Sequence, residues 1–498
     1  MEILATSSTQ YLRVKPDENT DTSILINCKK VKETGELIVE NCIFNQLALG
    51  IYKFPLAQLT RELWFPENLK PYQIEDVQKM VACSKVLNFN RMGYGKTIEA
   101  IKAMRELQID TALIVAPKSV LAQWVAQIKK WYPEMRDKVG IYGEKWVPKQ
   151  GRIVVTNYEK LIKDTNLQRL KSWQWPVLIA DEAHRIKNRN SKRTKAIKEI
   201  PAQRKWALTG TPITRLADDL WSILNFLGSF YSGKSYWNFV YFFCDVKDGF
   251  FGLEIKGLTK DERRLDILHQ ALDAIGITHP DLQLTPGKQV ENVQIAMDNK
   301  QKKLYNNTKN LVLDELPEGM TIANGAVLVT RLMQVTSNPS QFIEGCWGAK
   351  FDYIGDFLED EPGKIVIFSK FATTCKSLHR YLRQRGFWTN LYIGEMDATD
   401  RYESKQSFIT EEKVAAIIGT IGAMGEGVDG LQDVCHNVIF IDRDFSPEIN
   451  KQAEDRLNRI GQKHHVFVQY LECEKTYDKH VTTTNLRRAD DIRRALSD

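Results

Sequence analysis

Two arginines near the C-terminal end, Arg456 and Arg459, stand three residues apart in the string Gln-Ala-Glu-Asp-Arg-Leu-Asn-Arg-Ile-Gly-Gln-Lys (452–463). The sequence predicts a short helix over 451–458, and this spacing would place both side chains on one face. Positive charge that reaches a transferring phosphate stabilises the transition state of phosphoryl transfer. The pair therefore indicates phosphoryl-transfer chemistry, provided that other segments hold the phosphates.

One such segment is Gly-Tyr-Gly-Lys-Thr at 93–97, between a predicted strand and a predicted helix over 98–107. Glycines there let backbone N–H groups face phosphates at a helix N-terminus. We predict that Gly93 and Gly95 cradle the phosphates of ATP, that Lys96 reaches the β- and γ-phosphates, and that the Thr97 hydroxyl binds Mg²⁺. Asn90 stands where the strict motif has glycine, so a simple glycine turn is the alternative.

An acidic box, Asp-Glu-Ala-His at 181–184, follows the apolar run 177–180. A carboxylate at the carboxyl end of a strand beside a phosphate loop is where Mg²⁺ is held. We assign that role to Asp181, and we predict that Glu182 orients and deprotonates the attacking water. The alternative is an acidic start to an ordinary helix.

Two further turns are weaker signals. Leu-Thr-Gly-Thr-Pro at 208–212 offers two hydroxyls that would sense the acidic box, although alone it is an ordinary turn. Gly422, Gly425 and Gly427 form a glycine-rich stretch after the strand predicted to end at Gly419. A backbone could approach a phosphate there, and an ordinary loop explains the stretch equally well.

The composition sets limits on the class of protein. At 498 residues, with 43% hydrophobic and 27% charged residues, the chain is expected to form roughly two to four globular domains. No apolar run approaches the roughly 18 residues that span a bilayer. We expect no membrane association and an intracellular protein, in the cytoplasm or nucleoid of a bacterial host or in a eukaryotic nucleus. Eight scattered cysteines argue against a zinc ribbon or a secreted disulfide framework.

The net charge of +6 is unevenly distributed. Residues 185–205 are densely basic, with Glu199 as their only acid. A solvated helix face is the usual explanation of such a run. Directly after an acidic ATPase box, a nucleic-acid or regulatory contact becomes the preferred interpretation.

The elements that must position these residues follow two α/β rhythms. Short apolar runs separated by helical stretches predict a parallel sheet in each half of the chain, and they lie at 85–89, 113–116, 153–155, 177–180, 365–368, 415–418 and 438–441. Strands at 24–26 and 37–39 predict a β-rich unit before them. We interpret the aromatic residues after Phe226 as local core rather than a base-stacking platform, and we predict a helix over 261–275.

Three strings are particular to one family: residues 181–188, residues 220–227 and the arginine string. Through them the chain resembles the Swi/Snf-like ATPases of helicase superfamily two, over about residues 69–468. The resemblance implies an α/β fold with two RecA-like parallel-sheet lobes, helical insertions and a small N-terminal β-rich accessory domain. We accordingly expect an accessory domain at 1–60, a first lobe at 61–228, a helical insertion region at 229–345 and a second lobe at 346–498.

The resemblance also implies a DNA-dependent ATPase, acting as a monomer, that uses ATP and Mg²⁺ to move along double-stranded DNA and to remodel DNA-bound proteins. By position, Gln73 resembles the adenine-reading glutamine, and Arg456 and Arg459 resemble the arginine fingers of the second lobe. Six residues resemble those that contact the DNA backbone: Lys118, Ser119, Thr156, Asn157, Lys370 and Thr420.

Three departures from the family pattern stand out. Asn90-Arg91 replaces an acidic pair, Thr214-Arg215 replaces Gln-Asn, and the glycine-rich stretch before Val438 is longer than usual. None removes a group expected to touch phosphate or metal, so we expect activity to survive.

Two rival functions remain open. One is a strand-separating DNA or RNA helicase, for which the sequence offers no evident pin, although a short hairpin could lie within 231–341. The other is a DNA-binding scaffold with a silent ATPase, against which the intact motifs argue.

Overall fold

The computed structural model divides into two compact units, 1–281 with 490–498 and 282–489. No helix in its described part is long and apolar enough to cross a membrane. All eight cysteines lie in that part and are free thiols. The structure describes residues 2–4, 10–17, 20–53, 62–143, 147–210, 212–213, 218–249, 252–279, 282, 285–314, 322–361, 363–425, 428–459 and 461–496.

The N-terminal segment is β-rich, as expected. An antiparallel sheet has the order β1-β2-β4-β3, formed by Glu2–Leu4, Tyr11–Lys15, Leu37–Glu40 and Lys29–Lys30, and α1 (Ile43–Ala48) follows. The strand predicted at 24–26 is wrong. The side chain of Asn45 hydrogen-bonds both the N–H and the carbonyl of Ile26, each at 2.8 Å, so the Ile26 backbone needs no neighbouring strand.

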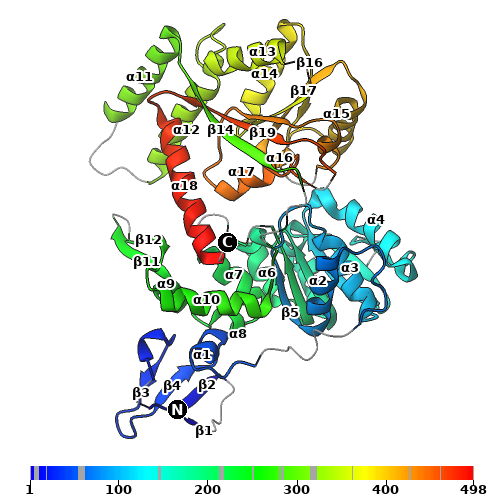
Figure 1. Cartoon of the computed structure of the whole chain (residues 1–498), viewed down its shortest axis with the longest axis vertical. Helices are drawn as coiled ribbons and strands as arrows, with labels where there is room; N and C mark the ends of the chain where they lie inside the picture. Colours follow the sequence, from blue (N-terminus) through cyan, green and yellow to red (C-terminus); the bar gives the residue numbers. More distant parts are fainter. Residues whose placement is uncertain are drawn as a thin grey trace. The chain divides into compact units, whose positions relative to one another are not determined.

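A seven-stranded parallel sheet forms the centre of the first unit (Figure 1). The strands, in spatial order, are β13 (Gly276–Ile277), β5 (Lys85–Asn88), β10 (Ala202–Leu208), β9 (Trp175–Asp181), β6 (Ala112–Ala116), β8 (Ile153–Asn157) and β7 (Val139–Ile141). The inner strands bury alternate residues in two cores, one on each face of the sheet: Val86 and Ile114 lie in one, Leu87 and Leu113 in the other. The parallel first lobe is therefore confirmed.

Helices complete this unit: α2 (Pro71–Ala82), α3 (Lys96–Glu106), α4 (Leu121–Trp131), α5 (Asp164–Lys171), α6 (Lys192–Glu199), α7 (Asp218–Leu227), α8 (Ser229–Ser232), α9 (Tyr236–Phe243) and α10 (Glu262–Ile275). Phe44 of α1 packs against Phe239 and Phe243 of α9, with ring centroids 5.9 and 4.9 Å apart. The accessory segment therefore shares a core with the helices that follow the first lobe.

The second unit contains a six-stranded parallel sheet, which confirms the second lobe. Its strands, in spatial order, are β14 (Lys288–Ile295), β19 (Val466–Cys473), β18 (Asn437–Phe440), β15 (Ile365–Ser369), β17 (Val414–Thr420) and β16 (Trp388–Tyr392). Its helices are α11 (Asn299–Asp314), α12 (Ile322–Ser337), α13 (Ala349–Asp360), α14 (Ala372–Gln384), α15 (Ala398–Thr410), α16 (Ile421–Met424), α17 (Pro447–Glu454) and most of α18 (Tyr477–Leu496).

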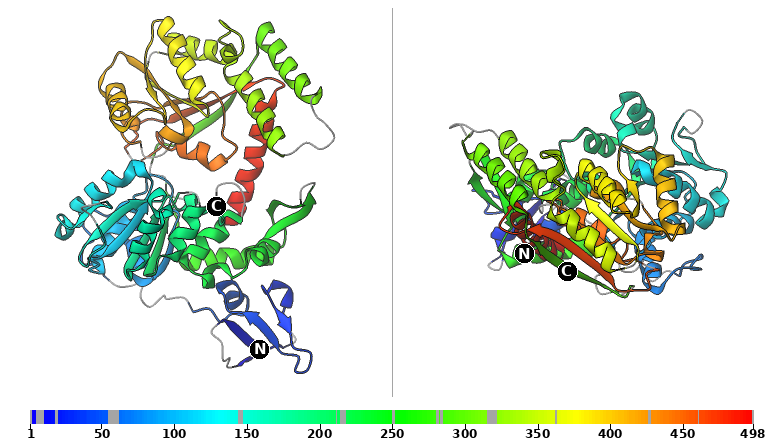
Figure 2. Two further views of the ribbon diagram at one scale, coloured as in Figure 1. Left: turned by 180° about the vertical axis from the view of Figure 1, so that it is seen from behind. Right: turned by 90° about the horizontal axis from the view of Figure 1, so that it is seen from above.

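The region 229–345 differs from the helical insertion that we expected. It does contain α8 to α12, and α10 matches the helix predicted over 261–275. It also supplies β13 to the first sheet, β14 to the second, and an antiparallel hairpin of β11 (Cys244–Gly249) and β12 (Gly252–Leu258). The hairpin extends away from α9 and α10 in Figure 1 and in the left view of Figure 2.

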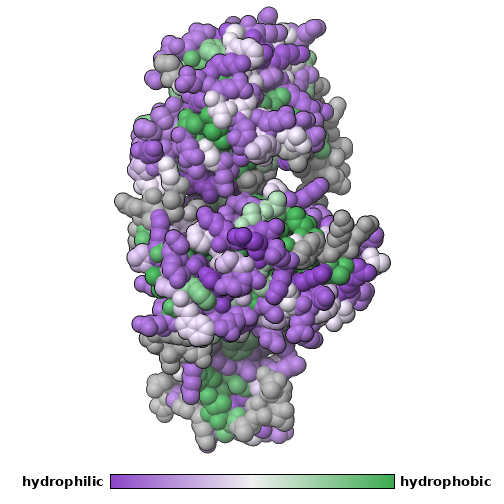
Figure 3. All heavy atoms as spheres, turned by 90° about the vertical axis from the view of Figure 1, so that its right-hand side faces the viewer, coloured by the Kyte–Doolittle hydropathy of each residue, from purple (hydrophilic) through white to green (hydrophobic). Residues whose placement is uncertain are grey.

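The aromatic residues after Phe226 are mostly core, as interpreted, because Phe239, Phe242 and Phe243 are buried. Trp237 and Tyr241 are exceptions, at 41% and 53% exposure. Elsewhere hydrophobic surface is scattered: on the face drawn in Figure 3, hydrophilic residues predominate and hydrophobic ones form small separate patches.

Candidate active site

Three adjacent strands of the first unit bring the predicted motifs to one edge of the sheet. Leu208 at the end of β10 pairs with Asn88 of β5 on one side and with Asp181 of β9 on the other. Neighbouring strands lie about 4.8 Å apart, so one strand separates the phosphate-loop strand from the acidic box. The carboxyl ends of parallel strands are where such sheets bind ligands.

The phosphate loop has the backbone conformation that its glycines allow. Gly93 and Gly95 have φ of +82° and +95°, in the left-handed region, and Gly95 is the N-cap of α3. The Lys96 ammonium donates to the carbonyls of Asn90 at 2.7 Å and Arg91 at 3.2 Å. The loop therefore curves around this amine at a helix N-terminus, which is the arrangement that binds phosphates.

Gln73 lies directly against this loop. Its amide N–H donates to the carbonyl of Tyr94 at 2.9 Å, and its side-chain oxygen accepts from the Lys70 N–H at 3.0 Å. A Cβ atom on Gly95 would lie 2.3 Å from the Gln73 amide nitrogen. Glycine at 95 is thus required by this contact as well as by its φ angle.

Asp181 is held by three hydrogen bonds. Its Oδ2 accepts from the indole N–H of Trp124 at 2.7 Å, its Oδ1 from the Glu182 N–H at 3.0 Å, and its carbonyl from the Tyr158 hydroxyl at 2.6 Å. Burial, followed by the charge of Glu182, raises the pKa of Asp181 to about 6, and the nearby charge of Lys96 opposes this rise.

Glu182 has a left-handed backbone with φ of +49°, which is uncommon for a residue with a side chain. Its Oε2 lies 3.4 Å from Nδ1 of His184, and that nitrogen lies 3.4 Å from the Thr209 hydroxyl. The Thr209 N–H donates to the Asn88 carbonyl at 2.9 Å. His184 therefore connects the acidic box with the turn after β10.

The second hydroxyl of that turn, Thr211, and the departures at Thr214 and Arg215 lie outside the described residues.

A buried polar layer beneath the loop was not predicted. The Asn90 amide donates to Asp76 at 2.7 Å, and the Asn88 amide donates to Glu99, also at 2.7 Å. His279 contacts the other Asp76 oxygen at 2.7 Å. Burial, followed by the charge of Asp76, raises the pKa of Glu99 to about 8. The departure from the family pattern at Asn90 was the one sequence signal of this layer, because an amide supplies a donor that a carboxylate lacks.

The two arginines of the second unit lie beyond the helix that was expected to carry them. Helix α17 ends at Glu454, so the helix predicted over 451–458 is wrong at its C-terminal end. Lys288 pairs with both Glu454 and Asp455 at 2.7 Å, and these ion pairs hold the chain in turns after the helix. Arg456 is buried and donates to the Gly425 carbonyl at 2.9 Å, whereas Arg459 pairs with Asp429. The arginines therefore do not share a helical face.

Lys370 and Thr420 lie at neighbouring carboxyl ends of the second sheet, because Ser369 of β15 pairs with Thr420 of β17. The Lys370 ammonium lies 3.2 Å from the carboxylate of Asp444. The Ser369 hydroxyl donates to Asp442 at 2.7 Å. Gly427, predicted to approach a phosphate, lies outside the described residues.

The remaining predicted DNA contacts differ in exposure. Lys118 and Ser119 are exposed on a 3-10 turn, Lys118–Val120, that leads directly into α4. Thr156 is fully buried at 0% exposure, so its side chain is absent from the surface. Asn157 is nearly buried, and its side-chain oxygen accepts from the Lys160 N–H at 2.8 Å.

The basic stretch 185–205 is divided between different environments. Lys192 and Lys195 of α6 are exposed, as a solvated helix face requires. Arg204 donates to the backbone carbonyls of Val81 and Cys83, so this basic residue of the stretch stabilises the fold. The stretch therefore does not form one continuous basic surface.

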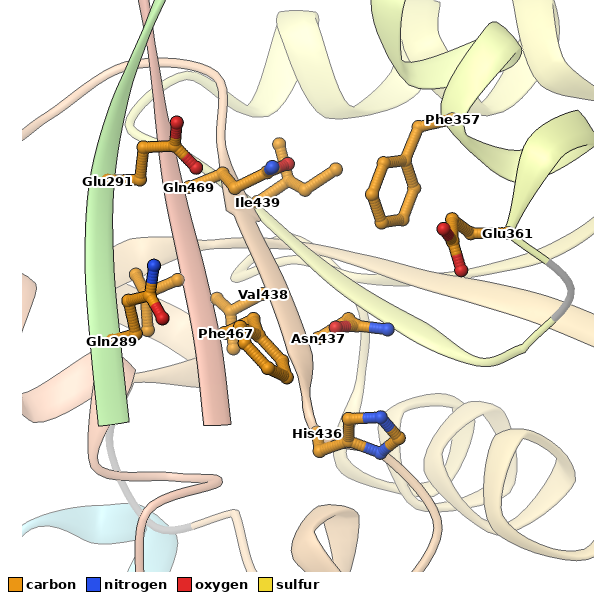
Figure 4. Close-up of a pocket in the computed structure, with 11 residues that line it drawn as sticks. Gln289, Glu291, Phe357, Glu361, His436, Asn437, Val438, Ile439, Phe467 and Gln469 are labelled. Atoms are coloured by element: carbon orange, nitrogen blue, oxygen red, sulfur yellow. The ribbon is translucent and has the colours of Figure 1, made fainter. Parts of the chain in front are cut away.

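A pocket of about 290 Å³ lies in the second unit, away from the predicted site residues. It is lined by residues of β14, β18 and β19, by His436 just before β18, and by Phe357 and Glu361, which face the strands across the opening (Figure 4). The lining residues of β14 and β19 lie in the amino-terminal halves of these strands, whereas Ser369 and Thr420 lie at the carboxyl ends of theirs.

Comparison with known proteins identifies the family. Residues 72–344 match the SNF2-related domain, which is more than half of the 498 residues. The chain belongs to the SNF2-related family. Residues 349–461 match the helicase conserved C-terminal domain.

Relatives of this SNF2-related chain include ATPases of chromatin-remodelling complexes. It is 25% identical over 456 residues to "SWI/SNF-related matrix-associated actin-dependent regulator of chromatin subfamily A member 1" of Mus musculus, covering 83% of this chain and 42% of that protein. It is 24% identical over 462 residues to "ISWI chromatin-remodeling complex ATPase ISW1" of Saccharomyces cerevisiae, covering 83% and 39%. The chain thus spans about two fifths of the length of these relatives.

A solved structure, the Sulfolobus solfataricus SWI2/SNF2 ATPase core in complex with dsDNA, is 24% identical in sequence. The match covers 88% of this chain and 99% of that one, with a TM-score of 0.42.

Proposed function

We propose that this SNF2-related chain is an ATP-dependent double-stranded DNA translocase, which hydrolyses ATP to move along DNA and to remodel DNA or DNA-bound proteins. The observation that carries the proposal is the row Asn88–Leu208–Asp181. This row brings the phosphate loop and the acidic box to one edge of the first sheet. Membership of the family adds support, because several relatives are named as ATPases of chromatin-remodelling complexes.

The first unit has residues that suit ATP and Mg²⁺. Gly95 is the left-handed N-cap that begins α3, where backbone N–H groups can bind a phosphate, and Lys96 supplies positive charge beside it. Thr97 and Asp181 would hold Mg²⁺, which is usually bound by one or two carboxylates together with substrate phosphates. When bound, Mg²⁺ neutralises charge that develops on the phosphates. Glu182 would accept the proton of the attacking water.

In the second unit, the structure favours Arg459 as the arginine finger and gives Arg456, the other predicted finger, a supporting role. Arg459 is partly exposed, and its partner Asp429 is 48% exposed, so the guanidinium can exchange this carboxylate for a phosphate. Arg456 is buried against the Gly425 carbonyl. It would therefore act chiefly by holding the glycine-rich stretch in place.

DNA would be bound through its backbone. Lys118 and Ser119 are exposed and suit phosphate contacts, and Asn157, Lys370 and Thr420 would complete the set. Thr156 would support this set from the core, since its side chain is buried. Backbone contacts position a protein on DNA without reading sequence, as a motor requires.

The test measures the ATPase rate with no nucleic acid, duplex DNA, single-stranded DNA and RNA. We expect duplex DNA to stimulate most, and the stimulation to fall as salt rises because counterion release drives the binding. The protein should also displace a triplex-forming strand from duplex DNA in an ATP-dependent way. Glu182→Gln is the matched negative control. Equal rates under all four conditions would contradict the proposal.

The β11–β12 hairpin favours a second candidate, a strand-separating helicase. It lies in the region where the sequence left a short hairpin open, and Leu253 on it is 47% exposed. Although its two strands also carry charged residues, an exposed apolar side chain such as Leu253 on a hairpin suits insertion between bases. Release of a strand from a tailed duplex, without triplex displacement, would select this function over translocation.

A further inference from the structure

We propose that Trp124 is a positioning residue that couples DNA binding to the orientation of the Asp181 carboxylate, which would bind Mg²⁺. Trp124 lies on the same continuous segment as the exposed residues that suit DNA. The inference rests on the proposed function and adds a route by which DNA controls the ATPase site. It concerns the first unit alone.

The contact between the two residues is specific. The indole N–H of Trp124 donates to Oδ2 of Asp181 at 2.7 Å, and Trp124 is only 1% exposed. An indole N–H is a donor only, and a buried donor without an acceptor costs stability. The position of the ring therefore decides where one of the two carboxylate oxygens lies.

The same segment begins with the exposed residues that suit DNA. The turn Lys118–Val120 leads without interruption into α4, and Trp124 lies in the first part of that helix. Leu121, Trp124 and Ile128 form the buried face of α4. If a DNA phosphate binds Lys118 and Ser119, it would shift the start of α4. Because α4 is a rigid helix, the Trp124 indole on its buried face would move as well.

The Asp181 carboxylate would respond to such a movement because its other contacts come from elsewhere. Oδ1 is held by the Glu182 N–H, and the main chain is held by Tyr158. A shift of α4 would therefore turn the carboxylate relative to its own strand. DNA binding and Mg²⁺ binding would then favour the same orientation of Asp181.

The experiment uses linkage, because coupling between two ligands is reciprocal. The Kd for a fluorescent duplex is measured by anisotropy, with and without Mg²⁺ and a non-hydrolysable ATP analogue. We expect the nucleotide to change the duplex Kd of the parent by roughly 5- to 150-fold, the usual range of such coupling. In Trp124→Phe, which keeps a ring and loses the donor, this factor should fall towards one. DNA stimulation of the ATPase should fall with it.

Trp131→Phe is the matched control, because the Trp131 indole donates within the same helix, to Gln127 at 2.7 Å. In Trp131→Phe, the nucleotide should change the duplex Kd by the same factor as in the parent. If Trp124→Phe does not fold, benzothienylalanine at position 124 keeps the shape of the indole and replaces its N–H with sulfur.

The coupling would be overturned if a variant without the N–H donor at position 124 showed the same nucleotide-dependent change in duplex Kd as the parent. A parent whose ATPase ignores DNA would instead overturn the proposed function, so the two failures are distinguishable.

Discussion

A Cβ atom on Gly210 would lie 3.0 Å from Cγ of Met92, so the turn after β10 lies directly against the phosphate loop. Gly210→Ala should push Met92 and the loop outward by a few tenths of an ångström. We expect kcat to fall about tenfold, equivalent to ~1.4 kcal/mol in the activation barrier, with a smaller change in the Kd for ATP. Steady-state kinetics and nucleotide binding check this. Gly363→Ala is the control, since nothing lies within 4 Å of the added atom and Gly363 belongs to none of the predicted motifs; equal effects of the two variants would contradict the prediction.

Glu182→Gln should retain ATP binding and lose hydrolysis, because the amide fits the site but cannot accept a proton. The expected loss in kcat is roughly 10²- to 10⁴-fold, measured by phosphate release. Glu159→Gln is the control, because Glu159 is exposed and lies 3.9 Å from Arg185. Parental turnover by Glu182→Gln would remove the acidic box from the chemistry.

Arg459→Ala should lose turnover while ATP affinity changes much less, since an arginine finger acts mainly in the transition state. Loss of such a finger costs roughly 10³- to 10⁵-fold in kcat. Asp429→Asn removes the charge that pairs with Arg459 and should leave turnover at or above the parental rate. If Arg459→Ala and Asp429→Asn lost activity equally, the ion pair would be structural.

Asn90→Asp should destabilise the first unit. The change removes the donor to Asp76 and adds a carboxylate beside it. We expect a loss of about 1–3 kcal/mol, typical of a buried polar group that loses its partner. Adding Asp76→Asn exchanges donor and acceptor and should restore much of the loss. Urea unfolding of the four proteins in this cycle measures the coupling; additive effects would argue against the contact.

Lys205→Gln should stabilise the protein and change its pH dependence. Lys205 of β10 pairs with Lys85 of the parallel neighbour β5, and the two like charges repel each other. Burial, and then the charge of Lys85, lowers the pKa of Lys205 from 10.5 to about 8. Between pH 8 and 10.5 the unfolded chain therefore binds more protons at this residue, so the free energy of unfolding rises with pH. Urea unfolding between pH 8 and 10.5 should show a smaller rise in the free energy of unfolding for Lys205→Gln than for the parent. The exposed control Lys195→Gln should show the same rise as the parent.

The sequence predicted those strands that are continuous apolar runs. β6 and β15 are buried along their whole length and have no polar interruption before their last residues. β10 was missed because Gln203, Arg204 and Lys205 interrupt it. β14 was missed because Lys-Gln-Val-Glu-Asn-Val-Gln-Ile is mostly polar, as an edge strand permits.

Within the candidate site, the local motifs were predictable and the long-range contacts were not. Glycine and lysine at 93–97 indicate a phosphate loop because their chemistry is local. The contact of Trp124 with Asp181 joins residues 57 apart, and it exists only because β6 and β9 are paired neighbours. The end of α17 likewise depends on Lys288, which the sequence places far from Glu454.

The pairing of β14 with β19 also has a consequence for biosynthesis. These two strands are paired in the second sheet, yet residues 288 and 466 are separated by most of that unit. On a ribosome that adds roughly 5–20 residues per second, β14 waits for on the order of ten seconds or more before its partner emerges. Because β14 is mostly polar, it should stay soluble while it is unpaired. An unpaired apolar strand would be prone to pair with another nascent chain. The second unit should therefore complete its sheet only late in translation, and a chain truncated before 466 should release β14 unpaired.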